Sequence, residues 1–188
     1  MMEKKDGGEL EKQKENKETW QGCVTAKVRR GTRNQVWSLI GDFLNLDKLH
    51  PMISICKLVE GVPGQPGCVR YCSDVPPTDD DVAGEATSNL WVKERLLSID
   101  PIGQSLSYEI TENNMGFTRY MAILKVVGGD DDDDGDEDGC SLEWCFEADP
   151  VVGFSEEGLV SILQNGLNGM AAKVEDALHA QFIIPCEF

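Results

Sequence analysis

The alternation of apolar and polar residues predicts strands and two short helices, followed by more strands and one long helix. Residues 1–18 are almost wholly polar and are expected to form a disordered tail. A period-two run from Trp20 to Val28 is typical of a strand. Apolar residues at helical spacing then predict two short helices, broken at Asn45 and stopped by Pro51: Val36, Leu39, Ile40, Phe43, Leu46 and Leu49. Thr32 or Asn34 can cap the first of them.

The remainder of the chain predicts six more strands and a final helix. The strands are expected at residues 53–60, 68–73, 90–100, 105–111, 119–127 and 140–148. From Ser155 onward a helix carries one continuous apolar stripe: residues 159, 162, 163, 167, 170, 174, 178 and 182. The stripe survives glycines at 158, 166 and 169, which weaken a helix locally.

This element order favours an α+β fold of about seven antiparallel strands. We expect a curved sheet wrapped around the long C-terminal helix, with the two short helices closing one end as a compact V. Residues 19–188 then make a single domain, which suits the chain's 188 residues. The polar loop at residues 74–88 and an acidic loop at 130–139 are expected to connect strands.

Charge and hydropathy exclude several classes of partner. The net charge is −17, and residues 130 to 138 alone hold eight acidic side chains, leaving 26 acidic against 17 basic ones elsewhere. Such a chain lacks the clustered Lys and Arg that nucleic acid or an anionic membrane requires. No apolar stretch approaches membrane-spanning length, and the first residues are charged, so neither membrane insertion nor a secretory signal is expected.

Metal ligands and disulfide patterns are not evident. The acidic loop aligns partly with an EF-hand, but Ser141 falls where the bidentate glutamate belongs, and its flanks are predicted strands. The seven cysteines include no C-x-x-C pair, and the chain has two histidines, so no metal or other cofactor is predicted. We interpret the cysteines as reduced, mostly buried thiols of a cytoplasmic protein.

The strongest chemical signal is a carboxylate on an otherwise apolar face of a predicted strand. Along residues 90–96, alternation places Glu94 on one face with Leu90, Val92 and Leu96. An isolated buried carboxylate costs several kcal/mol, so Glu94 should be protonated or paired. Arg70 is the expected partner, because the two residues are equidistant from a loop centred near residue 82.

A third polar group belongs with this pair. Tyr120 shares a strand face with Ala122 and Leu124, so an arginine, a carboxylate and a phenol can face one largely apolar chamber. Two interpretations of the group remain open. It is either a satisfied ion pair with a packed tyrosine, or a functional site in a cavity.

Several segments resemble the lachrymatory-factor-synthase-like branch of the plant START/pollen-allergen superfamily. The similar segments are Trp37 to Pro51 with Cys56-Lys-Leu-Val-Glu-Gly61, Gly67-Cys-Val-Arg-Tyr71, Trp91-Val-Lys-Glu-Arg-Leu96, and Gly116-Phe-Thr-Arg-Tyr120. The resemblance implies a hollow helix-grip fold around a small-molecule cavity. Abscisic-acid receptors share the superfamily, but their gate and latch motifs are absent here.

The same resemblance implies roles for the polar residues. In the synthase, an arginine, a glutamate and a tyrosine at the matching places isomerise a propenyl sulfenic acid to a thial S-oxide. Carried over, Glu94 would move the proton, while Arg70 and Tyr120 would hold the oxygen bonded to sulfur.

Two functions therefore remain: a monomeric cavity protein that binds a small hydrophobic metabolite or lipid, or an isomerase of this kind. A scaffold ranks third. The predicted ligand-binding wall comprises Cys68, Arg70, Leu90, Val92, Leu96, Tyr108, Tyr120, Leu163 and Leu167.

Overall fold

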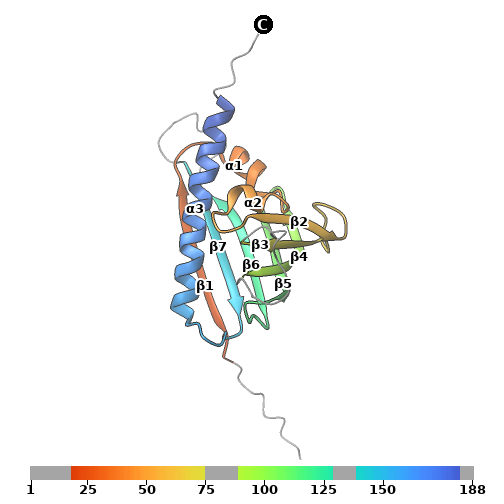
Figure 1. Cartoon of the computed structure of the whole chain (residues 1–188). Helices are drawn as coiled ribbons and strands as arrows, with labels where there is room; N and C mark the ends of the chain where they lie inside the picture. Colours follow the sequence, from red (N-terminus) through yellow and green to blue (C-terminus); the bar gives the residue numbers. More distant parts are fainter. Residues whose placement is uncertain (1–17, 75–88, 129–138, 183–188) are drawn as a thin grey trace, which may run out of the picture.

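A computed structural model describes residues 18–74, 89–128 and 139–182, and their arrangement follows the predicted element order (Figure 1). The elements are β1 (Trp20–Val28), α1 (Arg33–Ile40), α2 (Leu46–Leu49), β2 (Ile55–Glu60), β3 (Val69–Ser73), β4 (Trp91–Asp100), β5 (Ser105–Asn113), β6 (Tyr120–Val127), β7 (Cys140–Ala148) and α3 (Glu156–Phe182). The predicted tail and most of the two predicted loops, 74–88 and 130–139, lie outside the described residues.

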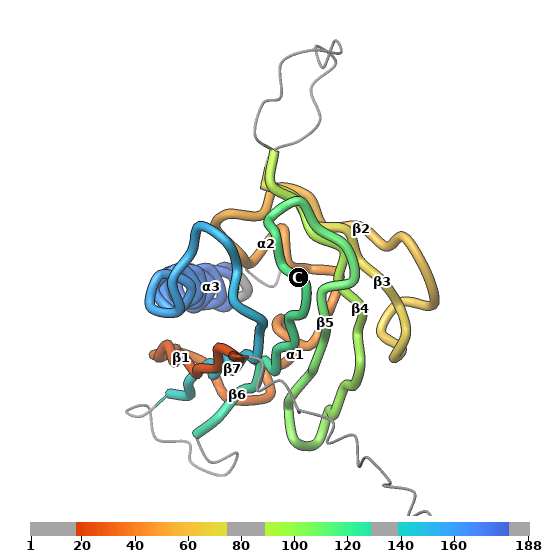
Figure 2. The backbone as a smooth tube through the Cα atoms, turned by 90° about the horizontal axis from the view of Figure 1, so that it is seen from below, coloured from red at the N-terminus to blue at the C-terminus, as the bar shows by residue number. Residues whose placement is uncertain are grey.

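The strands form one antiparallel sheet in the order β1-β7-β6-β5-β4-β3-β2. The first strand therefore pairs with the last, and β2 forms the opposite edge. Viewed end-on, the sheet curves around α3, while α1 and α2 lie across its open side (Figure 2). This is the α+β helix-grip arrangement predicted from the sequence.

The long helix α3 buries the predicted stripe against the sheet. Six stripe residues are buried: Leu159, Leu163, Leu167, Met170, Val174 and Leu178. Ile162 departs from the stripe, because its side chain is 42% exposed. Burial of this face stabilises the helix despite its glycines, since tertiary packing rather than propensity supplies most helical stability.

Local sequence fixes the two short helices. Thr32, one of the two predicted caps, caps α1: its side chain accepts from the Gln35 N–H at 3.3 Å, and the Gln35 side chain accepts from the Thr32 N–H at 2.8 Å. A turn follows α2, in which the Ile53 N–H donates to the His50 carbonyl at 3.3 Å. Because of this turn, β2 begins later than predicted. That strand begins at Ile55 instead of the predicted Ile53.

Two glycines of α3 let the segment after α2 approach closely. A Cβ atom at Gly166 would lie 2.6 Å from His50 Nε2, and one at Gly169 would lie 2.5 Å from Pro51 Cγ. Both distances are shorter than real contacts allow. The glycines that lower helix propensity therefore admit the His50-Pro51 corner against the helix.

One expectation about the cysteines is wrong. Cys23 of β1 and Cys145 of β7 form a disulfide, because the two residues are directly opposed in the strand register. A sequence without its strand register does not reveal such a pair. Four other cysteines in the described ranges are free thiols, namely Cys56, Cys68, Cys72 and Cys140. The cytoplasmic prediction was based on all cysteines being reduced, and the disulfide takes away that basis.

Candidate functional site

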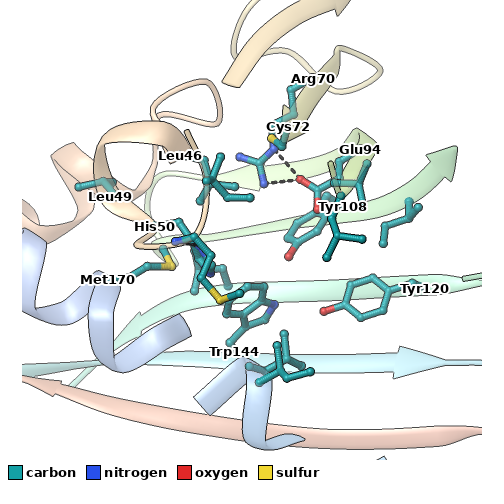
Figure 3. A pocket seen from close by; sticks show the side chains of 18 of the residues that line it. Leu46, Leu49, His50, Arg70, Cys72, Glu94, Tyr108, Tyr120, Trp144 and Met170 are labelled. Carbon is teal, nitrogen blue, oxygen red and sulfur yellow. Dashed lines mark hydrogen bonds and ion pairs between the residues drawn. The ribbon is translucent and has the colours of Figure 1, made fainter. Parts of the chain in front are cut away.

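A cavity of about 190 Å³ lies between the concave face of the sheet, the α1–α2 segment and α3. Its wall is largely apolar, and several aromatic and aliphatic side chains from distant parts of the chain meet there (Figure 3). The apolar contributors include Ile40, Leu46, Leu49, Val92, Leu106, Ile110, Phe117, Leu124, Leu159, Leu163 and Met170. Enclosed, mainly apolar spaces with a few convergent polar groups are typical of small-molecule sites.

The only ion pair in this wall joins Arg70 of β3 to Glu94 of β4, as far as the described residues go. The two residues are directly opposed in the strand register. Arg70 Nε donates to Glu94 Oε2 at 2.7 Å, and Nη2 lies 2.6 Å from the same oxygen. Both side chains are at least nine-tenths buried. The pairing predicted from the sequence is present, and it neutralises a carboxylate inside an apolar wall.

Both contacts from Arg70 converge on one carboxylate oxygen. Within the described part of the chain, Glu94 Oε1 accepts no hydrogen bond, and it is not sealed off from the cavity. Arg70 also donates through Nη1 to the Phe43 carbonyl, and its guanidinium lies 3.9 Å from the centre of the Phe43 ring. The guanidinium thereby orients Glu94 and ties the α1–α2 segment to the sheet.

The charge of Arg70 is secured by the same contacts. Burial, the largest single effect, lowers the pKa of Arg70, but Glu94 together with smaller contributions from Cys72, Cys56 and Tyr108 outweighs it and raises the pKa above its ordinary value. Arg70 therefore stays a cation throughout the accessible pH range.

Two phenols face the ion pair from the neighbouring strands. The rings of Tyr108 on β5 and Tyr120 on β6 have centroids 6.4 Å apart, and both side chains are buried. Tyr120 is held by a stacked contact with Phe146 at 6.1 Å. Burial, followed by the Glu94 carboxylate, raises the pKa of Tyr120; burial also raises the pKa of Tyr108. Both phenols therefore remain protonated hydrogen-bond donors.

Trp144 of β7 contributes a further donor that the sequence analysis missed. Its indole Nε1–H is buried and makes no hydrogen bond of good geometry among the described residues, although it is close enough to the Tyr120 hydroxyl to oppose part of the rise in the pKa of that phenol. The Tyr120 hydroxyl points toward this indole inside the cavity (Figure 3). An unsatisfied buried donor is costly unless a ligand or water accepts from it. Alternation along residues 140–148 places Trp144 inward with Leu142 and Phe146, so the signal was present in the sequence.

His50 is the second residue that the sequence analysis missed. Its ring meets Trp144 edge-on with centroids 6.2 Å apart, and it lines the cavity at the end of α2. Nδ1 accepts from the Met52 N–H at 3.2 Å, which places the proton of the neutral ring on Nε2. Burial first, then the charges of Arg70 and Lys173, lower the pKa of His50 to about 4. The ring is therefore neutral near pH 7.

Comparison with known proteins agrees with this architecture. The family described as polyketide cyclase / dehydrase and lipid transport matches residues 22–175. The chain belongs to this family. The structure of XoxI from Bacillus cereus is similar, with a TM-score of 0.62 and 20% identity over 88% of this chain and 99% of that one. Ginseng major latex-like protein 151 from Panax ginseng has a TM-score of 0.62 and 16% identity over 85% and 97%.

The residues predicted to form the ligand-binding wall can now be compared with those that line the cavity. Seven predicted residues line it: Arg70, Leu90, Val92, Glu94, Tyr108, Tyr120 and Leu163. None of the helices in the described ranges is long and apolar enough to cross a bilayer.

Three predicted wall residues lie elsewhere. Cys68, Leu96 and Leu167 do not line the cavity, and each has at most 1% of its side chain exposed. The Leu96 N–H donates to the Cys68 carbonyl at 2.9 Å, so these two residues lie side by side, two positions along their strands from Arg70 and Glu94. Strand alternation identified the inward face correctly, but it does not show where along that face the packed core replaces the cavity.

Proposed function

We propose that this protein binds a small, mainly apolar molecule that carries a hydrogen-bond-accepting oxygen. The observation that carries the proposal is the separation of polar from apolar groups in the cavity. Tyr108 and Tyr120 offer donors that face the Glu94 carboxylate, and Trp144 adds a donor beside Tyr120. The remainder of the wall is mainly aliphatic and aromatic, with Arg70, His50, Cys72, Asp42 and Asp74 as its other polar members. The cavity of about 190 Å³ is below the roughly 300–1,000 Å³ of drug-sized sites, which favours a small ligand.

A matched pair of probes tests the binding proposal. Dipropyl sulfoxide has an accepting oxygen, and dipropyl sulfide has the same chain without it. We expect the sulfoxide to bind the wild-type protein in a calorimetric or NMR titration. Leu163→Trp, which fills the cavity, should abolish binding, whereas Ala172→Trp adds the same ring to the exposed side of α3 and should leave it unchanged. Equal binding to both variants would contradict the proposal.

A second function, isomerisation of a sulfenic acid, is favoured by the accessible Oε1 of Glu94. In a propenyl sulfenic acid, this carboxylate oxygen would take the proton from the sulfenic O–H and deliver it to the alkene carbon one bond beyond the carbon attached to sulfur. The result is a thial S-oxide with the same atoms. Tyr120 and Trp144 would donate to the oxygen as it gains charge, and Arg70 would position Glu94 through Oε2.

Turnover of freshly generated propenyl sulfenic acid separates the two functions. An isomerase converts it to the thial S-oxide in the wild type and loses that conversion in Glu94→Gln, which keeps the size of the side chain. The sulfoxide titration on the same variant shows whether the cavity is still intact. A wild type that binds the sulfoxide and yields no thial S-oxide is a binding protein only.

A further inference from the structure

The concave face holds a second pair of reactive groups beside the ion pair. Cys56 on β2 and Cys72 on β3 are directly opposed in the strand register, and their sulfur atoms are 3.7 Å apart. Directly opposed residues of antiparallel strands have Cα atoms about 4.5 or 5.5 Å apart, and both separations lie within the range that a disulfide spans. The Cα separation expected for an opposed pair of this kind therefore matches that of a disulfide.

The two thiols differ in accessibility. β2 is one of the two edge strands of the sheet, and Cys56 is half-buried near the start of α2. Cys72 is 1% exposed and forms part of the cavity wall, two residues from Arg70. A small oxidant that enters from the edge therefore meets Cys56 first, with Cys72 directly behind it.

The surroundings also favour a thiolate at Cys56. The hydrogen bond with Cys72, acting against burial and helped by the positive charge of Arg70, lowers the pKa of Cys56 below its ordinary value. The same hydrogen bond and burial raise the pKa of Cys72. One sulfur is thus prepared to attack and the other retains its proton.

We propose that Cys56 and Cys72 form a redox-active dithiol that reacts with hydroperoxides and closes to a disulfide in the cavity wall. The Cys56 thiolate attacks the terminal oxygen of the hydroperoxide. The O–O bond breaks, leaving a sulfenic acid on Cys56, and the departing alkoxide takes up a proton and leaves as the alcohol. The Cys72 sulfur then attacks the Cys56 sulfur; the S–O bond breaks, and hydroxide leaves with the Cys72 proton as water.

These steps balance without any other reactant. The two thiols lose two electrons and two protons, and the hydroperoxide is reduced to an alcohol and water. Cys68 and Cys140 differ from this pair, because they are buried and have no cysteine directly opposite in the described strand pairs. Cys56 and Cys72 are thus a second cross-strand cysteine pair, on the opposite side of the sheet from the Cys23–Cys145 disulfide.

Tryptic peptides separate the relevant cysteines cleanly. Cleavage after Lys48, Lys57, Arg70 and Lys93 puts Cys56 in peptide 49–57, Cys68 in peptide 58–70 and Cys72 in peptide 71–93. The full-length protein is treated with an equivalent of hydrogen peroxide, its remaining thiols are blocked with N-ethylmaleimide, and the digest is analysed by mass spectrometry. We expect peptides 49–57 and 71–93 to be joined, with peptide 58–70 fully alkylated.

Variants identify the order of attack. Cys68→Ser should form the same linked peptide. Cys72→Ser should leave a sulfenic acid on Cys56 that dimedone captures, and Cys56→Ser should react with peroxide at least about tenfold more slowly than the wild type. A folded wild type in which peptides 49–57 and 71–93 stay unlinked would overturn the proposal. So would a link from either of them to Cys68.

Dipropyl sulfoxide gives a separate measurement of what the disulfide does to the cavity. This part rests on the proposed binding function, whereas peptide mapping does not. Because Cys72 belongs to the wall, we expect the oxidised protein to bind the sulfoxide with an altered affinity that a thiol reductant restores. Linked peptides together with absent sulfoxide binding would remove the binding function and leave the dithiol site standing.

Discussion

Arg70 and Glu94 are directly opposed on adjacent strands, and both guanidinium contacts reach the same carboxylate oxygen, Oε2. This arrangement leaves the other oxygen, Oε1, available to the cavity. The ion pair therefore stabilises the buried Glu94 carboxylate through Oε2 and leaves Oε1 free to contact a ligand. Both the stability and the chemistry of the protein should respond when either partner is changed.

Removal of Arg70 should be more damaging than removal of the whole pair. Arg70→Met leaves Glu94 buried without its partner and should lower the free energy of unfolding by about 3–5 kcal/mol in urea denaturation. The double variant Arg70→Met/Glu94→Leu replaces both charges with apolar groups and should recover most of that loss. A double variant as unstable as the single one would show that the pair itself, rather than an unpaired charge, determines the stability.

His50 should make the protein sensitive to mild acid. Its pKa is about 4 in the folded protein and 6.5 as the ordinary value, so the unfolded chain binds more protons between these pH values. The corresponding stability is fully present above pH 6.5 and is lost as the pH falls toward 4, by about 3 kcal/mol in total.

Urea denaturation at several pH values measures this contribution. His50→Gln should flatten the fall in stability between pH 6.5 and 4, whereas His179→Gln, at an exposed position of α3, should leave it unchanged. An identical pH dependence in the wild type and His50→Gln would contradict the assignment.

The glycines of α3 should respond in opposite ways to alanine. Helix propensity favours alanine by about 1 kcal/mol at each position. At Gly166 and Gly169 the added Cβ collides with His50 and Pro51, so both variants should lose about 1–3 kcal/mol. Gly158→Ala, whose Cβ would meet only the Ser155 Oγ at 3.3 Å, is the matched control and should be neutral or stabilising. Thermal unfolding of the three variants makes the comparison.

The disulfide between Cys23 and Cys145 should stabilise the edge strand β1. It joins residues 122 apart in sequence, and loss of such a cross-link should cost about 2–5 kcal/mol. Reductant should therefore lower the unfolding temperature of the wild type. The variant Cys23→Ser/Cys145→Ser should unfold at that lower temperature with or without reductant; a further decrease on its reduction would show that another disulfide contributes.

The periodicity of the sequence predicted the fold well, because the sheet has one buried face. Most strands and the long helix carry a buried apolar face, and this constrains their type and order; the edge strand β2, which has no buried residue, is the exception. The symmetry of Arg70 and Glu94 about residue 82 predicted their register, which the structure shows directly. The sequence pattern did not predict the turn after α2, and β2 therefore starts two residues later than predicted.

The site was predicted less completely, because a cavity depends on where elements stop packing. Leu167 and Met170 belong to the same helical stripe, yet only Met170 lines the cavity. His50 lines it because Gly166 lets the corner after α2 approach α3, a tertiary contact with no local signal. The Cys23–Cys145 pair likewise depends on the pairing of the first strand with the last.

A structure of the protein with dipropyl sulfoxide bound tests the central claim most directly. We expect the propyl groups among the aliphatic side chains and the sulfoxide oxygen within hydrogen-bond distance of the Tyr120 hydroxyl and Trp144 Nε1. Trp144→Phe, which removes the indole donor and shortens the ring, should weaken binding of the sulfoxide more than binding of dipropyl sulfide. A sulfoxide found on the surface, or one whose oxygen faces Leu159 and Leu163, would contradict the account.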